Sequence, residues 1–366
     1  MKATAALIRE VGGKFTLEDV EIAEPRGNEV RVRIVGVGMC HTDLVARDGF
    51  PVPMPIVLGH EGSGVVEALG PDVQGLAVGD HVVLSFNSCG ACPTCDEHAP
   101  AYCHNFMGLN FAGVRLDDGS SPLSQGDAVV HGNFFGQSSF ATVAIANARN
   151  TVKVDKSLPL EILGPLGCGI QTGAGGVVLS LGLKAGQSLA IFGGGAVGLS
   201  GLLAAKAIGA GTVIVVEPNV ERGRLAKELG ANHVINPRET EDVLAAIKEL
   251  TGAGVNCAFD TTGIPAVIGT AFEALGPHGT LGMVAVPPPE AMMPASLMSG
   301  LVRGVTVKFI TEGDADPQAF IPQMLEWYQA GKFPFDRLVK TFAFDHINEA
   351  AHASESGEAI KPVLLI

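Results

Sequence analysis

Four cysteines lie close together in the segment SCGACPTCDEHAPAYC, residues 88–103, with the spacing C-x2-C-x2-C-x7-C. Four thiolates at such short intervals can converge on one tetrahedral zinc ion, with zinc–sulfur bonds of about 2.3 Å. The alternative is an iron–sulfur cluster, because bacterial ferredoxins use the run C-x2-C-x2-C-x3-C-P. Here the last gap is seven residues and no proline follows the fourth cysteine. The pattern therefore favours a structural zinc site, closed to further ligands, formed by Cys89, Cys92, Cys95 and Cys103.

A second set of potential metal ligands is spread through the segments GMCHTD (38–43), GHEGSG (59–64) and GPLGCGIQTG (164–173). Taken singly, a lone cysteine is usually a core residue and a lone histidine usually has no catalytic role. Taken together, two thiolates and one imidazole are the ligand type of a catalytic zinc, with one position left for water or substrate. We therefore predict a second metal site, which the fold must assemble from Cys40, His60 and Cys168.

A glycine-rich segment, GGGAVG, follows the apolar run SLAIF (188–192). It fits the dinucleotide-binding fingerprint G-x-G-x-x-G, in which glycines let the backbone approach a pyrophosphate at a helix N-terminus. Glu217 comes nineteen residues after the last of these glycines. A carboxylate there binds ribose hydroxyls and repels a 2′-phosphate, which favours NAD over NADP, although Arg222 lies near enough to pair with a phosphate. The predicted cofactor-binding residues of the segment are Gly193, Gly195, Ala196, Val197 and Gly198.

The elements that must position these residues are of two kinds. Residues 1–150 alternate short β-branched runs with glycine and proline turns, as in EVRVRIVGVG, which is typical of antiparallel or barrel-like sheets. After about residue 165, apolar strands alternate with segments of helical length, which predicts a doubly wound parallel sheet. The C-terminal residues return to a mixed pattern. We predict an α/β chain with two domains, 1–168 with 306–366 and 169–305.

Composition narrows the classes of partner. The chain has 366 residues, of which 47% are apolar, and a formal net charge of −14. Such an acidic protein attracts neither nucleic acid nor an anionic membrane surface. Two uncharged stretches, 162–183 and 185–205, are long enough to span a bilayer, but their many glycines favour strand–glycine loop–helix units instead. The N-terminus has too short an apolar run for a signal peptide, so we expect a cytoplasmic protein with reduced thiols.

The order of the motifs CHTD, GHEGSG, the four-cysteine segment, GCGIQTGAG and GGGAVG resembles the zinc-dependent medium-chain dehydrogenase/reductase family over essentially the whole chain. Within that family, the segments ARDGFPVPMPIVLGHEGSG, FFGQSSF, ITEGDADP and GKFPFDRL look most like the bacterial aryl-alcohol (benzyl alcohol) and geraniol dehydrogenases. The resemblance implies a GroES-like, β-rich catalytic domain and a Rossmann NAD-binding domain. It also implies two zinc ions per chain, one catalytic and one structural, and a homodimer or homotetramer.

The resemblance further implies roles for single residues around the catalytic zinc. The three predicted ligands match the family's catalytic-zinc set, and Glu61 matches a neighbour able to ligate transiently. Asp43 matches the carboxylate that orients the zinc-bound histidine by fixing the tautomer of its ring. Thr42 matches the hydroxyl that takes the alcohol proton. For the cofactor, His41 and Lys361 match pyrophosphate contacts, and Thr172 matches a nicotinamide neighbour.

The activity that the resemblance implies is oxidation of a primary aromatic or allylic alcohol to its aldehyde, with hydride transfer to NAD. The alternative substrates within the family are short aliphatic or cinnamyl alcohols. Many family members pass the proton on to a histidine five residues after the first zinc cysteine, where this chain has Val45, so water, Arg47 or His41 must take its place. Two rival functions are a zinc-independent reductase or non-catalytic relative, and an iron–sulfur electron carrier built on the four-cysteine segment.

Overall fold

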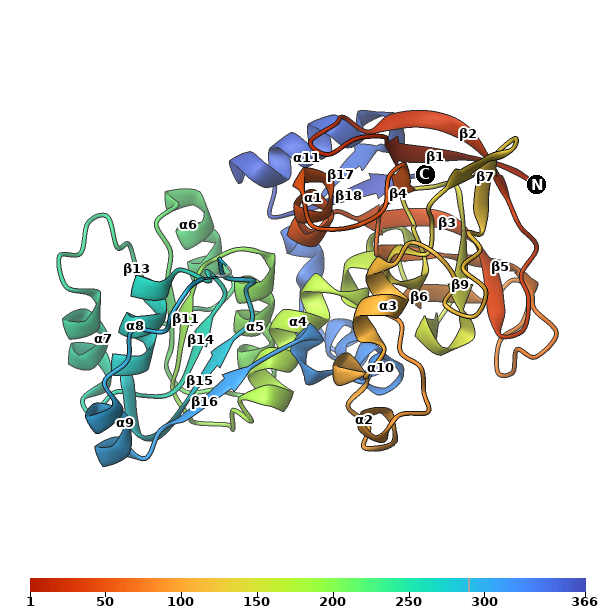
Figure 1. Ribbon diagram of the computed structural model, residues 1–366. Helices are drawn as coiled ribbons and strands as arrows, with labels where there is room; N and C mark the ends of the chain where they lie inside the picture. Colours follow the sequence, from red (N-terminus) through yellow and green to blue (C-terminus); the bar gives the residue numbers. More distant parts are fainter. Residues whose placement is uncertain (289) are drawn as a thin grey trace. The chain divides into compact units, whose positions relative to one another are not determined.

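The computed structural model describes residues 1–288 and 290–366, and they form two compact units (Figure 1). The first unit comprises Met1–Cys168, Asp316–Pro322 and Asp336–Ile366, and the second comprises Gly169–Ala315 and Gln323–Phe335. None of the helices in the described part of the chain has the length and apolar character needed to cross a membrane.

The first unit contains two sheets that are antiparallel except for one pair of strands. The five-stranded sheet has the order β4-β1-β2-β7-β8 and consists of β1 (Lys2–Ile8), β2 (Thr16–Ile22), β4 (Ile56–Val57), β7 (Leu123–Gln125) and β8 (Ala128–Val130). The seven-stranded sheet has the order β10-β6-β5-β3-β18-β17, with β9 also paired to β3. Its strands are β3 (Glu29–Gly38), β5 (Glu61–Leu69), β6 (His81–Leu84), β9 (Val143–Asn147), β10 (Thr151–Val154), β17 (Val339–Ala343) and β18 (Lys361–Leu365). Only β17 and β18 pair in parallel, and β18 pairs with β3, so the end of the chain completes a sheet begun near its start.

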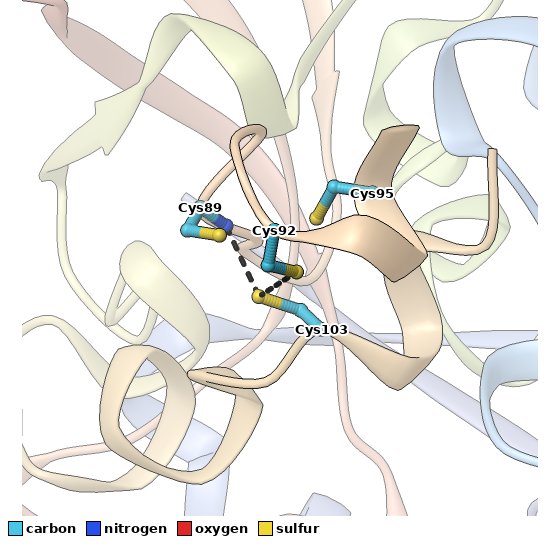
Figure 2. A group of neighbouring side chains, drawn as sticks. All are labelled: Cys89, Cys92, Cys95 and Cys103. Carbon is cyan, nitrogen blue, oxygen red and sulfur yellow. Dashed lines mark hydrogen bonds between the residues drawn. The ribbon is translucent and has the colours of Figure 1, made fainter. Parts of the chain in front are cut away.

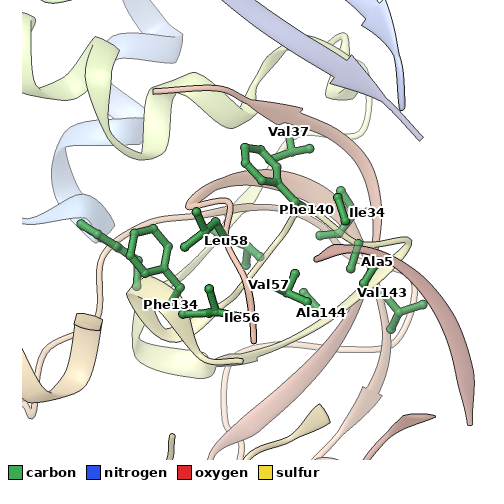
Figure 3. Close-up of a cluster of buried hydrophobic side chains, with 14 of the residues drawn as sticks. Ala5, Ile34, Val37, Ile56, Val57, Leu58, Phe134, Phe140, Val143 and Ala144 are labelled. Carbon is green, nitrogen blue, oxygen red and sulfur yellow. The ribbon is translucent and has the colours of Figure 1, made fainter. Parts of the chain in front are cut away.

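The strand β3 shows why the N-terminal part of the chain forms sheets. Val30, Val32 and Ile34 alternate with arginines and are buried, whereas Arg33 is exposed. This period of two places one apolar side chain in the core at every second position. Figure 3 shows Ile34 and Val37 of β3 in one apolar cluster with residues 56–58, Phe140 and Val143. The antiparallel, strand-rich organisation predicted for residues 1–150 is confirmed.

Short helices and turns lie between the strands of these two sheets. The helices are α1 (His41–Asp48), α2 (Pro93–Asp96), α3 (Phe106–Phe111) and α11 (Ile347–Ser356), and the first six residues of α10 (Pro317–Gln329) also belong to this unit. Turns of 3-10 type lie at Pro100–Tyr102, Phe134–Gly136, Ala148–Asn150, Leu160–Ile162, Gly164–Gly167, Phe335–Leu338 and Phe344–His346. The loop around α2 turns tightly enough to gather the four cysteines of segment 88–103 (Figure 2).

The second unit is a six-stranded parallel sheet with the order β13-β12-β11-β14-β15-β16. Its strands are β11 (Leu189–Phe192), β12 (Val213–Val216), β13 (His233–Ile235), β14 (Val255–Asp260), β15 (Leu275–Met283) and β16 (Thr306–Phe309). The chain builds outward from β11 in one direction and then from β14 in the other. The sheet is therefore doubly wound, and the point between β11 and β14 where the strand order reverses is where such folds bind their ligands.

Helices connect the strands of this sheet, as Figure 1 shows. They are α4 (Gly169–Gly175), a π turn (Gly176–Ser180), α5 (Ala196–Ala207), α6 (Val220–Glu228), α7 (Val243–Thr251), α8 (Pro265–Glu273) and α9 (Leu297–Arg303), with a 3-10 turn at Glu312–Asp314. The fold class predicted from the sequence is confirmed. The uncharged stretch 185–205 is the predicted strand–loop–helix unit, but 162–183 is not, because its glycines and proline break it into successive helical turns without a strand.

Candidate active site

Four potential metal ligands from separate parts of the first unit lie together. One ligand atom from each of Cys40, His60, Glu61 and Cys168 lies within 4.8 Å of the other three. Cys40 follows β3 and precedes α1, and Cys168 follows the 3-10 turn that begins at Gly164. His60 comes directly before β5, and Glu61 is the first residue of that strand. The fold thus assembles the three ligands predicted from distant segments, and it adds the carboxylate that the family resemblance had named.

The His60 imidazole is oriented by a buried carboxylate. Its Nδ1 lies 2.8 Å from Asp43 Oδ1, and both side chains are fully buried. Asp43 also accepts hydrogen bonds from the backbone N–H groups of Cys40, at 2.9 Å, and Gly59, at 3.1 Å, so it is held in place by the first turn of α1. Because the carboxylate accepts a hydrogen bond from Nδ1–H, Nε2 keeps its lone pair for a metal ion. Nε2 is buried and has no hydrogen-bond partner among the described residues.

The two thiols of the cluster also suit a metal ion. The hydrogen bond with Cys168 lowers the pKa of the Cys40 thiol well below its usual value, while burial opposes this shift and the charge of Lys361 reinforces it. A thiolate is the form of cysteine that binds metals. Two thiolates and one buried imidazole nitrogen are a zinc donor set, and a partnerless buried nitrogen costs free energy when no ion is bound. A zinc ion therefore fits these residues.

The Glu61 carboxylate is held by a buried lysine from the other end of the chain. Lys361 Nζ lies 2.9 Å from Glu61 Oε1 and 3.0 Å from Oε2, and it donates a third hydrogen bond to the carbonyl of Met39 at 3.3 Å. The two side chains are 3% and 0% exposed. Gly38 leaves room for this pair, because a Cβ there would stand 2.0 Å from Glu61 Oε2. Lys361, which the resemblance identifies as a pyrophosphate contact, thus lies beside the predicted metal ligands.

Two phenylalanines pack against the His60 ring. The Phe135 ring stacks on the imidazole, with centroids 4.4 Å apart and an interplanar angle of 26°, and Phe134 meets it edge-on at 5.6 Å. Phe111 packs against both phenylalanines, at 5.8 and 5.1 Å. Phe135 has a φ of 51°, in the left-handed region. Reasoning from residue types missed this aromatic wall, although the run NFFGQSSF, with two adjacent phenylalanines before a glycine, was a usable signal.

The residues of α1 surround a small cavity. Its volume is about 290 Å³, and it is lined by His41, Leu44, Val45, Asp48, Gly49, Phe50 and Glu355. Thr42, on the same helix, has its hydroxyl oxygen 3.8 Å from the Cys40 sulfur. Arg47 donates to both Asp48 oxygens, at 2.7 and 2.8 Å, and also pairs with Glu355. Because its guanidinium is already engaged with two carboxylates, Arg47 is a poor replacement for the histidine that family members carry in place of Val45.

The four cysteines of segment 88–103 form a separate cluster in the same unit (Figure 2). Their sulfur atoms lie within 4.8 Å of one another, and the Cys92 and Cys103 sulfurs are 3.9 Å apart. Four sulfurs around one ion at about 2.3 Å each are separated by about 3.8 Å, so the cluster has the size of a single-ion site. Backbone N–H groups of Cys89, His104 and Asn105 donate to these sulfurs. The hydrogen bond from Thr94 is the largest of the effects that lower the pKa of Cys92 to about 5, which favours a thiolate.

The glycine fingerprint occupies the predicted place in the second unit, between β11 and α5. Gly193 has a φ of 101°, which a side chain would strain. A Cβ on Gly198 would stand 1.9 Å from the Gly193 carbonyl oxygen, so only glycine allows this tight turn. Gly195 is the N-cap residue of α5, and the next residues, Ala196 and Val197, form its first turn. The helix therefore directs its first N–H groups toward the end of β11, as pyrophosphate binding requires.

Two side chains next to this loop bear on which dinucleotide it binds. Glu217 follows β12 and is buried, and its carboxylate accepts from the backbone N–H of Gly194 at 2.5 Å and of Asn219 at 2.7 Å. The anion is thus fixed beside the fingerprint. Arg222 lies in α6, and its Nε is buried without a hydrogen-bond partner in the described residues. Thr172, on α4, is buried as well.

Comparisons with known proteins agree with this geometry. Residues 26–156 match the model described as alcohol dehydrogenase GroES-like domain, and residues 196–330 match the one described as zinc-binding dehydrogenase. The chain is 58% identical to geraniol dehydrogenase of Castellaniella defragrans over 100% of its own length and 98% of that protein. It is 45% identical to a probable alcohol dehydrogenase of a Pseudomonas species over 76% of its own length and 88% of that protein.

Solved structures of the same size superpose closely on the chain. The alcohol dehydrogenase zinc-binding domain protein of Burkholderia ambifaria is 49% identical, with a TM-score of 0.98. Benzyl alcohol dehydrogenase of Acinetobacter calcoaceticus is 47% identical, with a TM-score of 0.97. In both cases the match covers 100% of this chain and 99% of the other. The predicted family resemblance is confirmed, and the chain belongs to the zinc-dependent, NAD(P)-using alcohol dehydrogenases of the medium-chain family.

Proposed function

We propose that the protein oxidises aromatic or allylic primary alcohols to aldehydes, reversibly, by hydride transfer to NAD. The observation that carries the proposal is the set of Cys40, His60 and Cys168, whose ligand atoms lie within 4.8 Å of one another. His60 and Cys168 are buried, and His60 Nε2 has no hydrogen-bond partner in the described residues. The rival reading as a zinc-independent or non-catalytic relative does not account for such a donor set. An iron–sulfur carrier does not account for the nucleotide fingerprint.

The chain's own residues prepare the site for this reaction. A zinc ion held by the three ligands would supply Lewis acidity that makes the alcohol easier to deprotonate. Asp43 fixes the ring of His60 and its tautomer, and Lys361 holds the Glu61 carboxylate beside the ligands. Thr42, next to Cys40, is the hydroxyl proposed to take the alcohol proton. Val45 cannot carry that proton further and Arg47 is engaged, so we propose that water in the cavity lined by His41 carries it out.

The substrate class is proposed from the similarity to two named relatives. The relatives named geraniol dehydrogenase and benzyl alcohol dehydrogenase carry the allylic and the aromatic alcohol in their names. Short aliphatic or cinnamyl alcohols are the alternative.

The preference for NAD over NADP is proposed from Glu217. Its carboxylate is fixed next to the fingerprint by two backbone N–H groups, so it can accept from ribose hydroxyls and would repel a 2′-phosphate. If the protein used NADP, Arg222 would be the residue to pair with the 2′-phosphate, since its Nε has no hydrogen-bond partner in the described residues.

The second zinc is proposed for the cluster of Cys89, Cys92, Cys95 and Cys103, where four protein ligands leave no open position. The functional division into 1–168 with 306–366 and 169–305 remains a prediction.

Two further properties are proposed. The seven thiols would persist in a reducing compartment such as the cytoplasm. A homodimer or homotetramer is supported by exposed apolar side chains in the edge strand β16 and in the residues that precede it. They are Val286, Met292, Leu297, Met298, Leu301, Val302 and Phe309. A second copy could pair its β16 with this β16, because an edge strand is self-complementary about a two-fold axis.

The ligand assignment is tested by replacing Cys168 with alanine. We expect the variant to lose about one zinc per chain and nearly all turnover while the chain still folds. The matched control is Cys257→Ala, which removes an equally buried thiol from β14 and should leave the zinc content unchanged. Full activity and full zinc content in Cys168→Ala would contradict the three-ligand site.

A further inference from the structure

Two buried polar side chains form hydrogen bonds to the backbone beside His60 and Cys168. Ser85 follows β6 directly and is 0% exposed, and Gln137 follows the 3-10 turn Phe134–Gly136 and is 1% exposed. The proposed reaction uses neither side chain. Because a buried polar group is costly unless it forms hydrogen bonds, the partners of these two side chains show which parts of the chain they hold in place.

The Gln137 amide bridges two backbone segments. Its Nε2 donates to the carbonyl oxygens of His60, at 2.9 Å, and Ser85, at 3.0 Å. Its Oε1 accepts from the backbone N–H of Gly62 at 3.1 Å. Both amide hydrogens and the carbonyl oxygen are therefore used, and only this orientation of the amide satisfies all three contacts. Gly62 lets the amide approach, because a Cβ there would crowd Oε1 at 3.1 Å.

The Ser85 hydroxyl extends this connection to the segment of Cys168. Its Oγ donates to the carbonyl oxygen of Gly167, the residue before the ligand, at 2.6 Å. Only glycine allows this approach, because a Cβ on Gly167 would stand 1.9 Å from the Leu84 carbonyl oxygen. Asn150 fixes the backbone of Ser85, since its carbonyl accepts from the Ser85 N–H and its Nδ2 donates to the Ser85 carbonyl, both at 2.9 Å. Ser85 is thus a fixed point to which the segments of both ligands are bonded.

We propose that Ser85 and Gln137 are positioning residues of the catalytic zinc site, which set the separation of His60 and Cys168. The inference rests on the proposed function, in which these residues bind a zinc ion. The two ligands belong to segments far apart in the sequence, so their separation depends on contacts between those segments and not on local spacing. Asp43 orients the His60 ring, whereas Ser85 and Gln137 fix the backbones that carry the ligands. A metal ion binds most tightly where its ligands already stand in place, because no rearrangement then opposes binding.

The test is the metal affinity of Ser85→Ala and Gln137→Met, which remove these hydrogen bonds without adding a charge. Competition with a chelator measures the affinity for zinc. The visible spectrum of the cobalt(II) form shows which site holds the metal, because two sulfurs and a nitrogen absorb differently from four sulfurs. We expect the affinity of the catalytic site to fall about tenfold in each variant, as for other residues that support metal ligands. The cobalt bands of that site should shift, and the affinity of the four-cysteine site should stay unchanged.

Ser200→Ala is the matched control. The Ser200 hydroxyl also donates to a backbone carbonyl, that of Ala196, at 2.6 Å and is also 0% exposed, but it lies on α5 in the other unit. This variant should leave both metal affinities unchanged. Unchanged affinity and cobalt spectrum in the two test variants, or equal weakening of both metal sites, would overturn the inference even if the variants unfold more easily. If the parent protein bound no metal at Cys40, His60 and Cys168, the proposed function itself would fall.

Discussion

Replacing Lys361 by methionine should destabilise the protein by about 3–5 kcal/mol, because it leaves the Glu61 carboxylate buried without its cation. The ammonium lies 2.9 and 3.0 Å from the two carboxylate oxygens, and the side chains are 3% and 0% exposed, so water cannot replace the lost partner. Burial already raises the pKa of Glu61, which marks the desolvation that the lysine offsets. The assay is the free energy of unfolding in urea at pH 7, on zinc-loaded protein.

The surface pair of Lys340 and Glu358 provides the matched control. Its atoms lie 2.6 Å apart, but the side chains are 47% and 64% exposed, so Lys340→Met should cost less than about 1 kcal/mol. The double variant Lys361→Met with Glu61→Gln removes both buried charges and should recover most of the lost stability. The reasoning is refuted if Lys361→Met costs no more than Lys340→Met, or if the double variant is less stable than Lys361→Met alone.

Three other substitutions test separate parts of the site. Asp43→Asn keeps the shape of the side chain but no longer fixes the His60 tautomer, so zinc affinity measured by competition with a chelator should fall about 10–100-fold; unchanged affinity would contradict the orienting role. Cys103→Ser should remove about one zinc per chain, seen by metal analysis, and lower the unfolding midpoint, whereas retention of both zinc ions would disprove the four-thiolate site. Glu217→Ser should raise kcat/KM with NADP relative to NAD by an order of magnitude or more, and an unaltered ratio would count against its ribose contact.

Local patterns explain which parts of this molecule were predictable. Alternation of Val30, Val32 and Ile34 with arginine identified a half-buried strand, since the period of two is a property of the strand itself. The spacing from Cys89 to Cys103 and the glycines from Gly193 to Gly198 predicted sites because all their residues lie in one short segment. Residues so close in sequence lie near one another in space in almost any fold.

Contacts between distant segments were not predictable from residue types. Glu61 and Lys361 are 300 positions apart, and nothing in either neighbourhood indicates that a sheet pairing of β18 with β3 joins them. The stacking of Phe135 on His60 has the same origin, because it joins residues 75 positions apart through a turn in which Phe135 has a left-handed φ. Segment 162–183 was predicted wrongly for a local reason: its apolar residues suit a buried strand, but its glycines and Pro165 favour short helical turns.

The central claim is tested most directly by the initial rate of NAD reduction by the purified protein on benzyl alcohol, geraniol and ethanol. The proposed substrate class predicts that kcat/KM for benzyl alcohol or geraniol exceeds that for ethanol by orders of magnitude. Equal values for ethanol and the two larger alcohols would contradict the proposed substrate class. No NAD reduction with any of the three, in protein shown to hold two zinc ions per chain, would contradict the proposed reaction on these alcohols.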